Sequence, residues 1–312
     1  MKKLIVIISI IIYQSNFSQN QLHIGQYMVH QPFMNIACIS EDKDINGAIF
    51  HKSQWTGIEG APVIQGLNIN FPLKNNKDFL GLSLVNDKIA INDLKELSAI
   101  YAHNLKTGKN SSLTMSLAGL LGFHKSDFTQ IQVFSPNDPV FTSGIPTVVL
   151  PNFKFGTYFN WNKFNIGISI PTILQTNVIY TTQHEGNIQF NKNNIHIYIH
   201  SGYSFEINKD LDLKTSFLIK EVAGAPIQFD FNSQIDYKNK FSIGSSYRTS
   251  NELLAMASCT IAEDFILSYG YEMNFTDLSN HSSGTHEILL KFRIRDNNKI
   301  DMPLLNESII TD

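Results

Sequence analysis

The sequence predicts an all-β protein: a transmembrane, antiparallel, up-and-down outer-membrane β-barrel of about 14 strands. Three observations carry this prediction. They are a repeated two-residue alternation of apolar and polar side chains, an alternation of short and long connectors, and an N-terminal export signal. The composition agrees, because charged residues are only 16% of the chain and aromatic residues are 11%. Low charge with many aromatic residues suits a sheet whose two faces meet different solvents.

The first 18 residues have the features of a signal peptide. Two lysines precede a continuous apolar run from Leu4 to Tyr13, and polar residues follow. This run is too short for a transmembrane helix, which needs about 20 apolar residues. We therefore expect residues 1–18 to be removed near Ser18. No later window is apolar enough for such a helix, so membrane insertion of the mature chain would use strands.

Apolar and polar side chains alternate clearly in residues 163–170, 195–205, 227–237 and 285–295. A period of two predicts strands with one apolar and one polar face. In the third segment the predicted lipid face holds Ile227, Phe229, Phe231 and Ile235. The predicted lumen face holds Gln228, Asp230, Asn232 and Gln234. An arginine at Phe231 is therefore expected to impair assembly, and an arginine at Asn232 is expected to be tolerated.

Segments of this kind give 14 predicted strands of about ten residues, the length that a tilted strand needs to cross a bilayer. They span residues 45–55, 62–72, 78–87, 95–105, 111–124, 150–160, 163–172, 194–206, 211–221, 226–236, 240–250, 252–261, 264–274 and 284–295. Residues 126–134 are either a further strand or part of a loop. The predicted barrel thus covers residues 45–295.

The predicted connectors differ in length at the two ends of the barrel. Those at one end are short and mostly rich in Lys and Asn: 73–78, 105–110, 160–163, 207–210, 237–240 and 262–264. The alternate connectors include longer ones: 88–94, 125–150, 173–193 and 275–284. Short periplasmic turns and longer outer loops are typical of outer-membrane barrels.

The two flanking segments follow from this topology. An even strand count places both ends of the barrel on the short-turn side, so we expect the mature N-terminus in the periplasm. Residues 19–44 form a periplasmic or lumenal segment that either fills the lumen or binds a periplasmic component. Residues 296–312 form a C-terminal tail.

The tripeptide Gly-Ala-Pro occurs twice, each time before an alternating run. Glycine supplies the positive φ that short hairpins need, and proline is tolerated at the first residue of a strand. We therefore predict two hairpin tips at the outer rim, with Trp55 and Phe50 in an aromatic girdle. The tips are also a hypothetical partner-binding surface, together with loop 125–150, because a small rigid tip admits another backbone. The residues are Gly60, Ala61, Pro62, Gly224, Ala225 and Pro226. The alternative is that they only shape the rim.

No catalytic, cofactor-binding or metal-ligating residue is predicted, and the chain has no nucleophile motif of an enzyme. Residues 42–50 copy the start of a calcium loop, but Ser53 at its twelfth position has no carboxylate. His196 and His200 lie about 13 Å apart along one strand face, too far to share a metal ion. They are expected to point into a polar lumen.

Three further features bound the function. Asp230 and Asp236 are expected on the lumen face, where nearby water makes unpaired carboxylates tolerable. Cys38 and Cys259 are the only cysteines, and both a disulfide and two free thiols remain open. The net charge of −3 gives no basic footprint for nucleic acid, so no such partner is expected.

Eight stretches, in this order and spacing, resemble the PorP/SprF-type membrane proteins of the type IX secretion system. They are QYMVHQPFMNIA (26–37), SQWTGIEGAPV (53–63), GLSLVNDKIA (81–90), SPNDPVF (135–141), LPNFKFGTYF (150–159), FLIKEVAGAPIQFDFN (217–232), SSYRTSN (245–251) and GTHEILLKF (284–292). The resemblance runs from about Gln26 to Arg295. Both Gly-Ala-Pro hairpins recur in proteins of this kind.

The resemblance implies a barrel in the lipid of the bacterial outer membrane that works with the type IX secretion machinery. Its expected role is to help a secreted cargo protein, such as a large adhesin or its C-terminal domain, to reach or stay on the cell surface. It also links the chain to gliding motility. The alternative is an outer-membrane porin or uptake channel, which the polar inward face favours.

Overall fold

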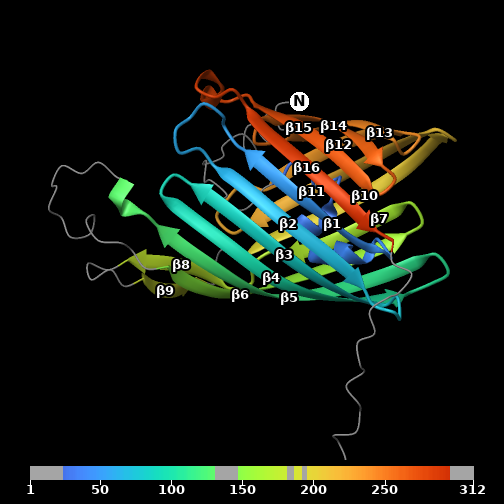
Figure 1. The fold of residues 1–312 in the computed structure, drawn as a ribbon, viewed down its shortest axis with the longest axis horizontal. Coiled ribbons are helices and arrows are strands. Elements are labelled where there is room, and N and C mark those ends of the chain that lie inside the picture. The colour runs from blue at the N-terminus through green and yellow to red at the C-terminus, as the bar shows by residue number, and fades with distance from the viewer. Residues whose placement is uncertain (1–23, 131–146, 181–185, 192–194, 296–312) are drawn as a thin grey trace, which may run out of the picture.

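The computed structural model describes residues 24–130, 147–180, 186–191 and 195–295. Fourteen strands form a closed antiparallel barrel in the order β1-β16-β15-β14-β13-β12-β11-β10-β7-β6-β5-β4-β3-β2 (Figure 1). Strands that are neighbours in this wall are also consecutive along the chain, apart from the step between β7 and β10 and the closure of β1 on β16. The predicted up-and-down barrel of 14 strands is therefore confirmed.

The barrel strands agree with the predicted ones to within three residues at every end. They are β1 (Ile45–Ser53), β2 (Val63–Pro72), β3 (Asp78–Ile89), β4 (Asn92–Lys106), β5 (Ser111–Ser126), β6 (Val148–Trp161), β7 (Phe164–Ile170), β10 (His196–Asn208), β11 (Leu211–Val222), β12 (Gln228–Tyr237), β13 (Phe241–Arg248), β14 (Glu252–Ala262), β15 (Phe265–Asn274) and β16 (Thr285–Ile294). No helix in the described ranges is both long and apolar enough to cross a bilayer.

The connectors differ from the prediction in two places. The expected loop 88–94 is a tight turn, because β3 continues to Ile89 and Ala90 adopts a positive φ of 48°. The expected loop 173–193 contains a separate two-stranded sheet, β8 (Gln175–Tyr180) with β9 (Gly186–Asn191). Residues 126–134 add no barrel strand within the described part. There, β5 is followed by the short helix η3 (Phe128–Gln130).

The two faces of the wall are apolar outside and polar inside, as the alternation predicts. On β12 the Phe231 side chain is 56% exposed, whereas Asp230 and Asn232 are 0% and 5% exposed. The predicted register of this strand is therefore confirmed. The girdle position of Phe50 is wrong, because on β1 it shares the lumen face with Ala48 and is 3% exposed. Its ring packs against Phe33, with 4.7 Å between the ring centroids.

Residues 24–44, which we call the plug, lie inside the barrel (dark blue in Figure 1). The plug contains two short helices, η1 (Gln31–Phe33) and η2 (Ile36–Ser40). Its apolar side chains form the core of the molecule with inward side chains of the wall: Ile24 with Phe50, Ile64, Val85 and Leu289, and Ile36 and Ile39 with Phe79 and Ile100. The apolar core therefore sits in the lumen.

The plug runs from the long-loop end of the barrel to the short-turn end. Ile24 packs against Ile64, one residue inside the long-loop end of β2. Near the other end, the Tyr158 hydroxyl donates to the Glu41 carboxylate at 2.5 Å. The first described residues thus lie toward the end opposite to the one expected for the mature N-terminus.

Candidate functional site: plug, ion-pair belt and rim

The end of the plug that lies toward the long loops, which we call its upper end, is hydrogen-bonded to the last strand, β16. The Glu287 carboxylate accepts hydrogen bonds from the backbone N–H groups of Gly25 at 2.8 Å and Gln26 at 3.0 Å. The Gln26 amide donates back to the Glu287 carbonyl at 2.9 Å and also bonds to Ser268. A Cβ on Gly25 would lie 3.1 Å from a Glu287 carboxylate oxygen, so glycine permits the close approach.

The middle of the plug is bonded to opposite sides of the wall. The His30 ring nitrogen Nε2 donates to Asn68 Oδ1 at 2.8 Å, and Tyr27 bonds to Asn232. The Asn35 side-chain amide donates to the Thr157 carbonyl at 2.9 Å and contacts His200 Nε2 at 2.9 Å. These bonds satisfy polar groups that the plug removes from water, which is the condition for burying them without a large penalty.

The lower part of the plug continues this pattern. Ser40 bonds to Thr114 on β5, with 2.6 Å between the hydroxyl oxygens. Gly156 and Gly167 make room for the plug. A Cβ on Gly156 would lie 2.4 Å from Asn35 Oδ1, and one on Gly167 would lie 2.6 Å from Asn35 Nδ2. His200 and His196 face the lumen, as predicted, and are 3% and 7% exposed.

Burial in the lumen changes the acid–base properties of the plug. It lowers the pKa of His30 to about 3, and the nearby Lys291 ammonium acts in the same direction. The Glu41 carboxyl is exposed at the lower end of the plug, yet the surrounding protein partly desolvates it and raises its pKa, an effect that Tyr158, Lys291 and Lys214 partly offset. His30 is therefore a neutral imidazole at ordinary pH, which allows it to be enclosed without a counter-ion.

A belt of buried ion pairs lines the lumen wall beside the upper end of the plug. It crosses from β1 to β11 and consists of Lys52, Glu287, Glu272, Arg248, Glu252, Asp230 and Lys220. All of these side chains are 13% exposed or less. Three cations thus meet four carboxylates, and the two plug N–H groups on Glu287 supply additional positive dipoles.

The distances show that the belt is continuous. Lys52 Nζ lies 3.0 Å from Glu287 and 3.9 Å from Glu272. The Arg248 guanidinium lies 3.4 Å from Glu272 and 3.1 Å from Asp230, and it also pairs with Glu252. The Lys220 ammonium lies 3.7 Å from Asp230.

Two lumenal carboxylates differ from expectation in their partners, although the structure places both on the predicted face. Asp230 is 0% exposed and is paired within the belt. Asp236 pairs with Lys214, with 2.5 Å between Nζ and Oδ2. The prediction that they are unpaired is wrong for two separate reasons. Around Asp230 the plug replaces bulk water, so this buried charge needs a partner. Asp236 lies at the short-turn end of β12, where the ammonium group of the exposed Lys214 is within reach.

The two Gly-Ala-Pro hairpins lie at the long-loop end. Gly60 and Gly224 have φ values of 73° and 87°, which confirms the predicted reason for glycine at these positions. Pro62 lies one residue before β2 and Pro226 two residues before β12. The prolines therefore precede the strands and do not begin them.

The two hairpin tips have different surroundings. The Ala90 N–H donates to the Gly60 carbonyl at 2.9 Å, so the first tip packs against the β3–β4 turn. A Cβ on Gly224 would meet nothing within 4 Å, so the second tip is open. Ala61 and Ala225 are both half-buried.

The strand order places the two tips across the mouth from each other. The connectors 249–251 and 275–284 separate them on one side, and the connectors after β3, β5 and β7 separate them on the other. The six predicted partner-binding residues thus form two separate sites. Most of loop 125–150, the third predicted component, lies outside the described residues.

The belt was missed from the sequence. Glu287, Arg248, Asp230 and Lys220 all lie in the stretches that carry the family resemblance, and Lys52 directly precedes one. The available signal was a charged residue on the lumen face near the outer end of several predicted strands. Alternation shows the face of each residue, but it does not show which charges on different strands meet.

Neither a disulfide nor a metal cluster is found among the described residues. Cys38 and Cys259 are both free. Cys38 lies in the plug, where its thiol donates to Gln31 Oε1 at 3.3 Å and burial raises its pKa. In the described ranges no three His, Cys, Asp or Glu side chains are grouped to hold a metal ion.

A closed barrel with an apolar outer face and a polar lumen defines an outer-membrane β-barrel protein. Among solved structures it is similar to the CymD monoaromatic hydrocarbon channel, with a TM-score of 0.52, 11% identity, and 88% of this chain and 94% of that chain covered. It is also similar to Omp33 of Acinetobacter baumannii, with a TM-score of 0.45, 8% identity, and 81% and 99% covered. At such identities the likeness to CymD concerns the fold alone. A comparison with curated proteins gives no match.

Residues 16–292 match the family described as type IX secretion system membrane protein PorP/SprF. The chain belongs to this family, and the resemblance seen in its motifs is confirmed. It is therefore an outer-membrane component of the type IX secretion system, associated with that machinery.

Proposed function

We propose that this barrel anchors or guides a secreted cargo protein at the cell surface and does not conduct solutes. The cargo class would be a large adhesin, engaged through the adhesin itself or its C-terminal domain. In this arrangement the short-turn end faces the periplasm and the mouth with the Gly-Ala-Pro tips faces outward. The observation that carries the proposal is the plug.

The plug is held as part of the fold. Its upper end is bonded to Glu287, its middle to Asn68 on β2 and Thr157 on β6, and its lower end to Thr114 on β5. A polypeptide cannot cross a lumen that another segment fills with buried side chains. Cargo would therefore engage this protein from outside the lumen, at its rim.

The rim offers a rigid platform for such contact. The belt joins strands β1 and β11, which lead into the two Gly-Ala-Pro hairpins, through six ion pairs below the mouth. Buried and multiply paired charges fix side chains strongly, because separating them leaves an unpaired charge. We assign the cargo contact first to the open tip at Gly224, Ala225 and Pro226, with Gly60, Ala61 and Pro62 as a second contact across the mouth.

The direct test removes the gene from its bacterium and measures the adhesin on the surface of intact cells and in the medium. Loss of surface adhesin, restored by the wild-type gene, is the expected result. Normal surface adhesin in the deletion strain would overturn the proposal. Restoration by a variant that lacks the plug would show that anchoring does not need a closed lumen.

A solute channel is the second candidate, favoured by the open cavity at the short-turn end that is described below. Planar-bilayer recordings separate the two functions. An anchor should stay closed at moderate voltage, whereas a channel should show steady unitary currents. Deletion of residues 24–40 should produce currents if the protein is an anchor with a closed lumen. If it is a channel, the deletion should change its currents little.

A further inference from the structure

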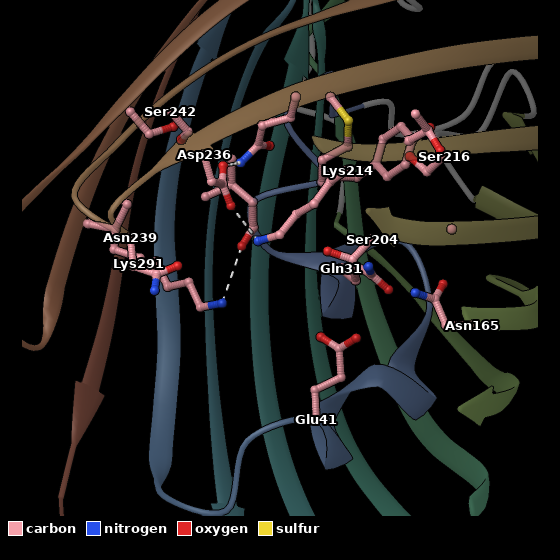
Figure 2. A pocket seen from close by; sticks show the side chains of 18 of the residues that line it. Gln31, Glu41, Asn165, Ser204, Lys214, Ser216, Asp236, Asn239, Ser242 and Lys291 are labelled. Carbon is pink, nitrogen blue, oxygen red and sulfur yellow. Dashed lines mark hydrogen bonds and ion pairs between the residues drawn. The ribbon is translucent and has the colours of Figure 1, made fainter. Parts of the chain in front are cut away.

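Below the plug, the barrel encloses a cavity of about 380 Å³. The plug covers one side of it, and the lower parts of β10 to β14 form most of the other. Asn239 and Lys240 lie at its mouth, in and beside the β12–β13 turn, so the cavity opens at the short-turn end. Figure 2 shows the side chains of Glu41, Lys214 and Lys291 entering the same space.

The charges of the cavity favour an anion. Lys214 forms an ion pair with Asp236, and the Glu41 carboxylate accepts a hydrogen bond from the Tyr158 hydroxyl. Lys240 and Lys291 have no carboxylate partner among the described residues, and the Lys291 ammonium donates to the Val29 carbonyl at 3.3 Å. Three lysines thus line the cavity against two acidic residues, Glu41 and Asp236, and two of the three lysines have no described carboxylate partner to compete with an acidic ligand.

The neutral part of the lining suits a peptide. Gln31, Asn165, Asn239 and Ser242 present amide and hydroxyl groups to the cavity (Figure 2). Such groups donate to and accept from a peptide backbone in any register. A volume of this size is within the range of ligand-binding pockets.

We propose that this cavity binds a carboxylate-bearing peptide segment, and that the segment is the chain's own residues 296–312. These 17 residues contain Asp296, Asp301, Glu307 and Asp312 against the single basic residue Lys299. Strand β16 ends at Ile294 and carries Lys291, so the segment starts beside the cavity wall. Seventeen residues reach roughly 55 Å when extended, far more than the entry requires.

The test uses the purified full-length protein in detergent and a fluorescent peptide of residues 296–312 as the probe. In one variant the four acidic residues of the segment are neutralised in place: Asp296→Asn, Asp301→Asn, Glu307→Gln and Asp312→Asn. This variant should bind the probe at least about 10-fold more tightly than the wild type, because a tethered segment competes at high effective concentration. The gain should disappear at high salt.

The lysines are tested in the same neutralised background. Lys240→Glu together with Lys291→Met should weaken probe binding at least about 10-fold. Lys77→Glu lies in the exposed β2–β3 turn, also at the short-turn end, and should leave probe binding unchanged. Lys240→Glu alone should weaken probe binding less than the double variant does. Because Lys240 is exposed, this single variant should still fold, so it tests the lysine even if the double variant misfolds.

Three outcomes would overturn the proposal. The first is equal binding of the probe by the wild type and the neutralised variant, which would mean that the cavity is free for a segment of another protein. The second is no binding to the neutralised variant. The third is binding that Lys240→Glu and Lys77→Glu weaken equally.

Discussion

The Glu287 carboxylate on the last strand accepts a hydrogen bond from the backbone N–H of Gly25 at 2.8 Å, although the two residues are 262 positions apart in the chain. The same carboxylate pairs with Lys52 on the first strand at 3.0 Å. Strands β1 and β16 are the pair that closes the barrel. One side chain therefore joins closure of the wall to docking of the plug, so that the plug binding site is complete only when the barrel is closed.

Glu287→Gln should loosen the plug. The substitution leaves Lys52 with a weakened counter-charge and replaces an ionised acceptor, and breaking a buried ion pair typically costs about 3–5 kcal/mol. We expect faster hydrogen exchange at the amides of residues 25–30 and intermittent channel openings in planar bilayers. Glu263→Gln, at a carboxylate that is 83% exposed, is the matched control and should change neither. Unchanged exchange in the Glu287 variant would contradict the clamp.

Phe231→Arg should impair assembly of the barrel. The side chain is 56% exposed on the lipid face, and arginine near the bilayer midplane costs about 2–4 kcal/mol in barrels of this kind. Ser242→Arg is the control, since Ser242 lines the water-accessible cavity. Heat-modifiable migration in gels reports the folded fraction of each variant. Equal folding of both variants would contradict the assigned register.

The fold was predictable because alternation is a local signal. A strand between lipid and a polar lumen must alternate, so Phe231 and Asp230 reveal their faces without knowledge of any other strand. Connector length then gives the order of strands, since consecutive strands pair in an up-and-down barrel. Phe50 was assigned to the wrong face, because an apolar side chain on the lumen face, like the neighbouring Ile64 and Leu289, becomes favourable only when the plug packs against it.

The candidate site could not be predicted in the same way, because it consists of contacts between the plug and different strands, and the alternation of side chains does not specify these contacts. Asn232 is inward as predicted, yet it bonds to Tyr27 of the plug and to Ser216. The expectation that Asn232→Arg is tolerated stays a prediction, and these contacts argue against it, because the longer side chain would displace Tyr27 from the filled lumen. The belt was missed for the same reason, because Lys52 and Glu272 meet only through the three-dimensional closure of the wall.

The plug should loosen at acid pH through His30. Burial lowers the pKa of His30 to about 3, below its ordinary value of about 6.5. The stabilisation is complete above pH 6.5 and is lost progressively as the pH falls toward 3. Between pH 6.5 and pH 4 the loss is about 3 kcal/mol. Hydrogen exchange of the plug, corrected for intrinsic rates, measures it. His30→Gln keeps a hydrogen-bond donor for Asn68, and its plug stability should depend less on pH. An identical pH dependence in this variant and the wild type would contradict the role of His30.

Single cysteines should report which end faces outward. With Cys38 and Cys259 replaced, a cysteine at Asn76 or Asn239 should be protected from an impermeant thiol reagent on intact cells, because both lie in short turns. Asn208, at the end of β10, should behave in the same way. A cysteine at Ser282, in the long connector 275–284, should react. Asn137 and Gln183, also expected to react, lie outside the described residues. Labelling at the short turns of intact cells would reverse the topology.

The two Gly-Ala-Pro tips should differ in their response to a bulky charge. Nothing lies within 4 Å of a Cβ at Gly224, so Ala225→Arg should leave barrel levels in the outer membrane unchanged and reduce adhesin on the cell surface. At the first tip, where Gly60 bonds to Ala90, Ala61→Arg should lower barrel levels as well. Ser250→Arg, in the exposed β13–β14 turn of the same rim, is the control and should affect neither quantity.

The combination of results decides between docking and a purely structural role for the tips. Surface adhesin is compared per folded barrel, so that a loss of barrel does not count as a loss of docking. Reduced adhesin per barrel in Ala225→Arg but not in Ser250→Arg supports contact of cargo with the open tip. Normal adhesin per barrel in Ala225→Arg would leave the motif with one function, the backbone turn that Gly224 makes possible at a φ of 87°.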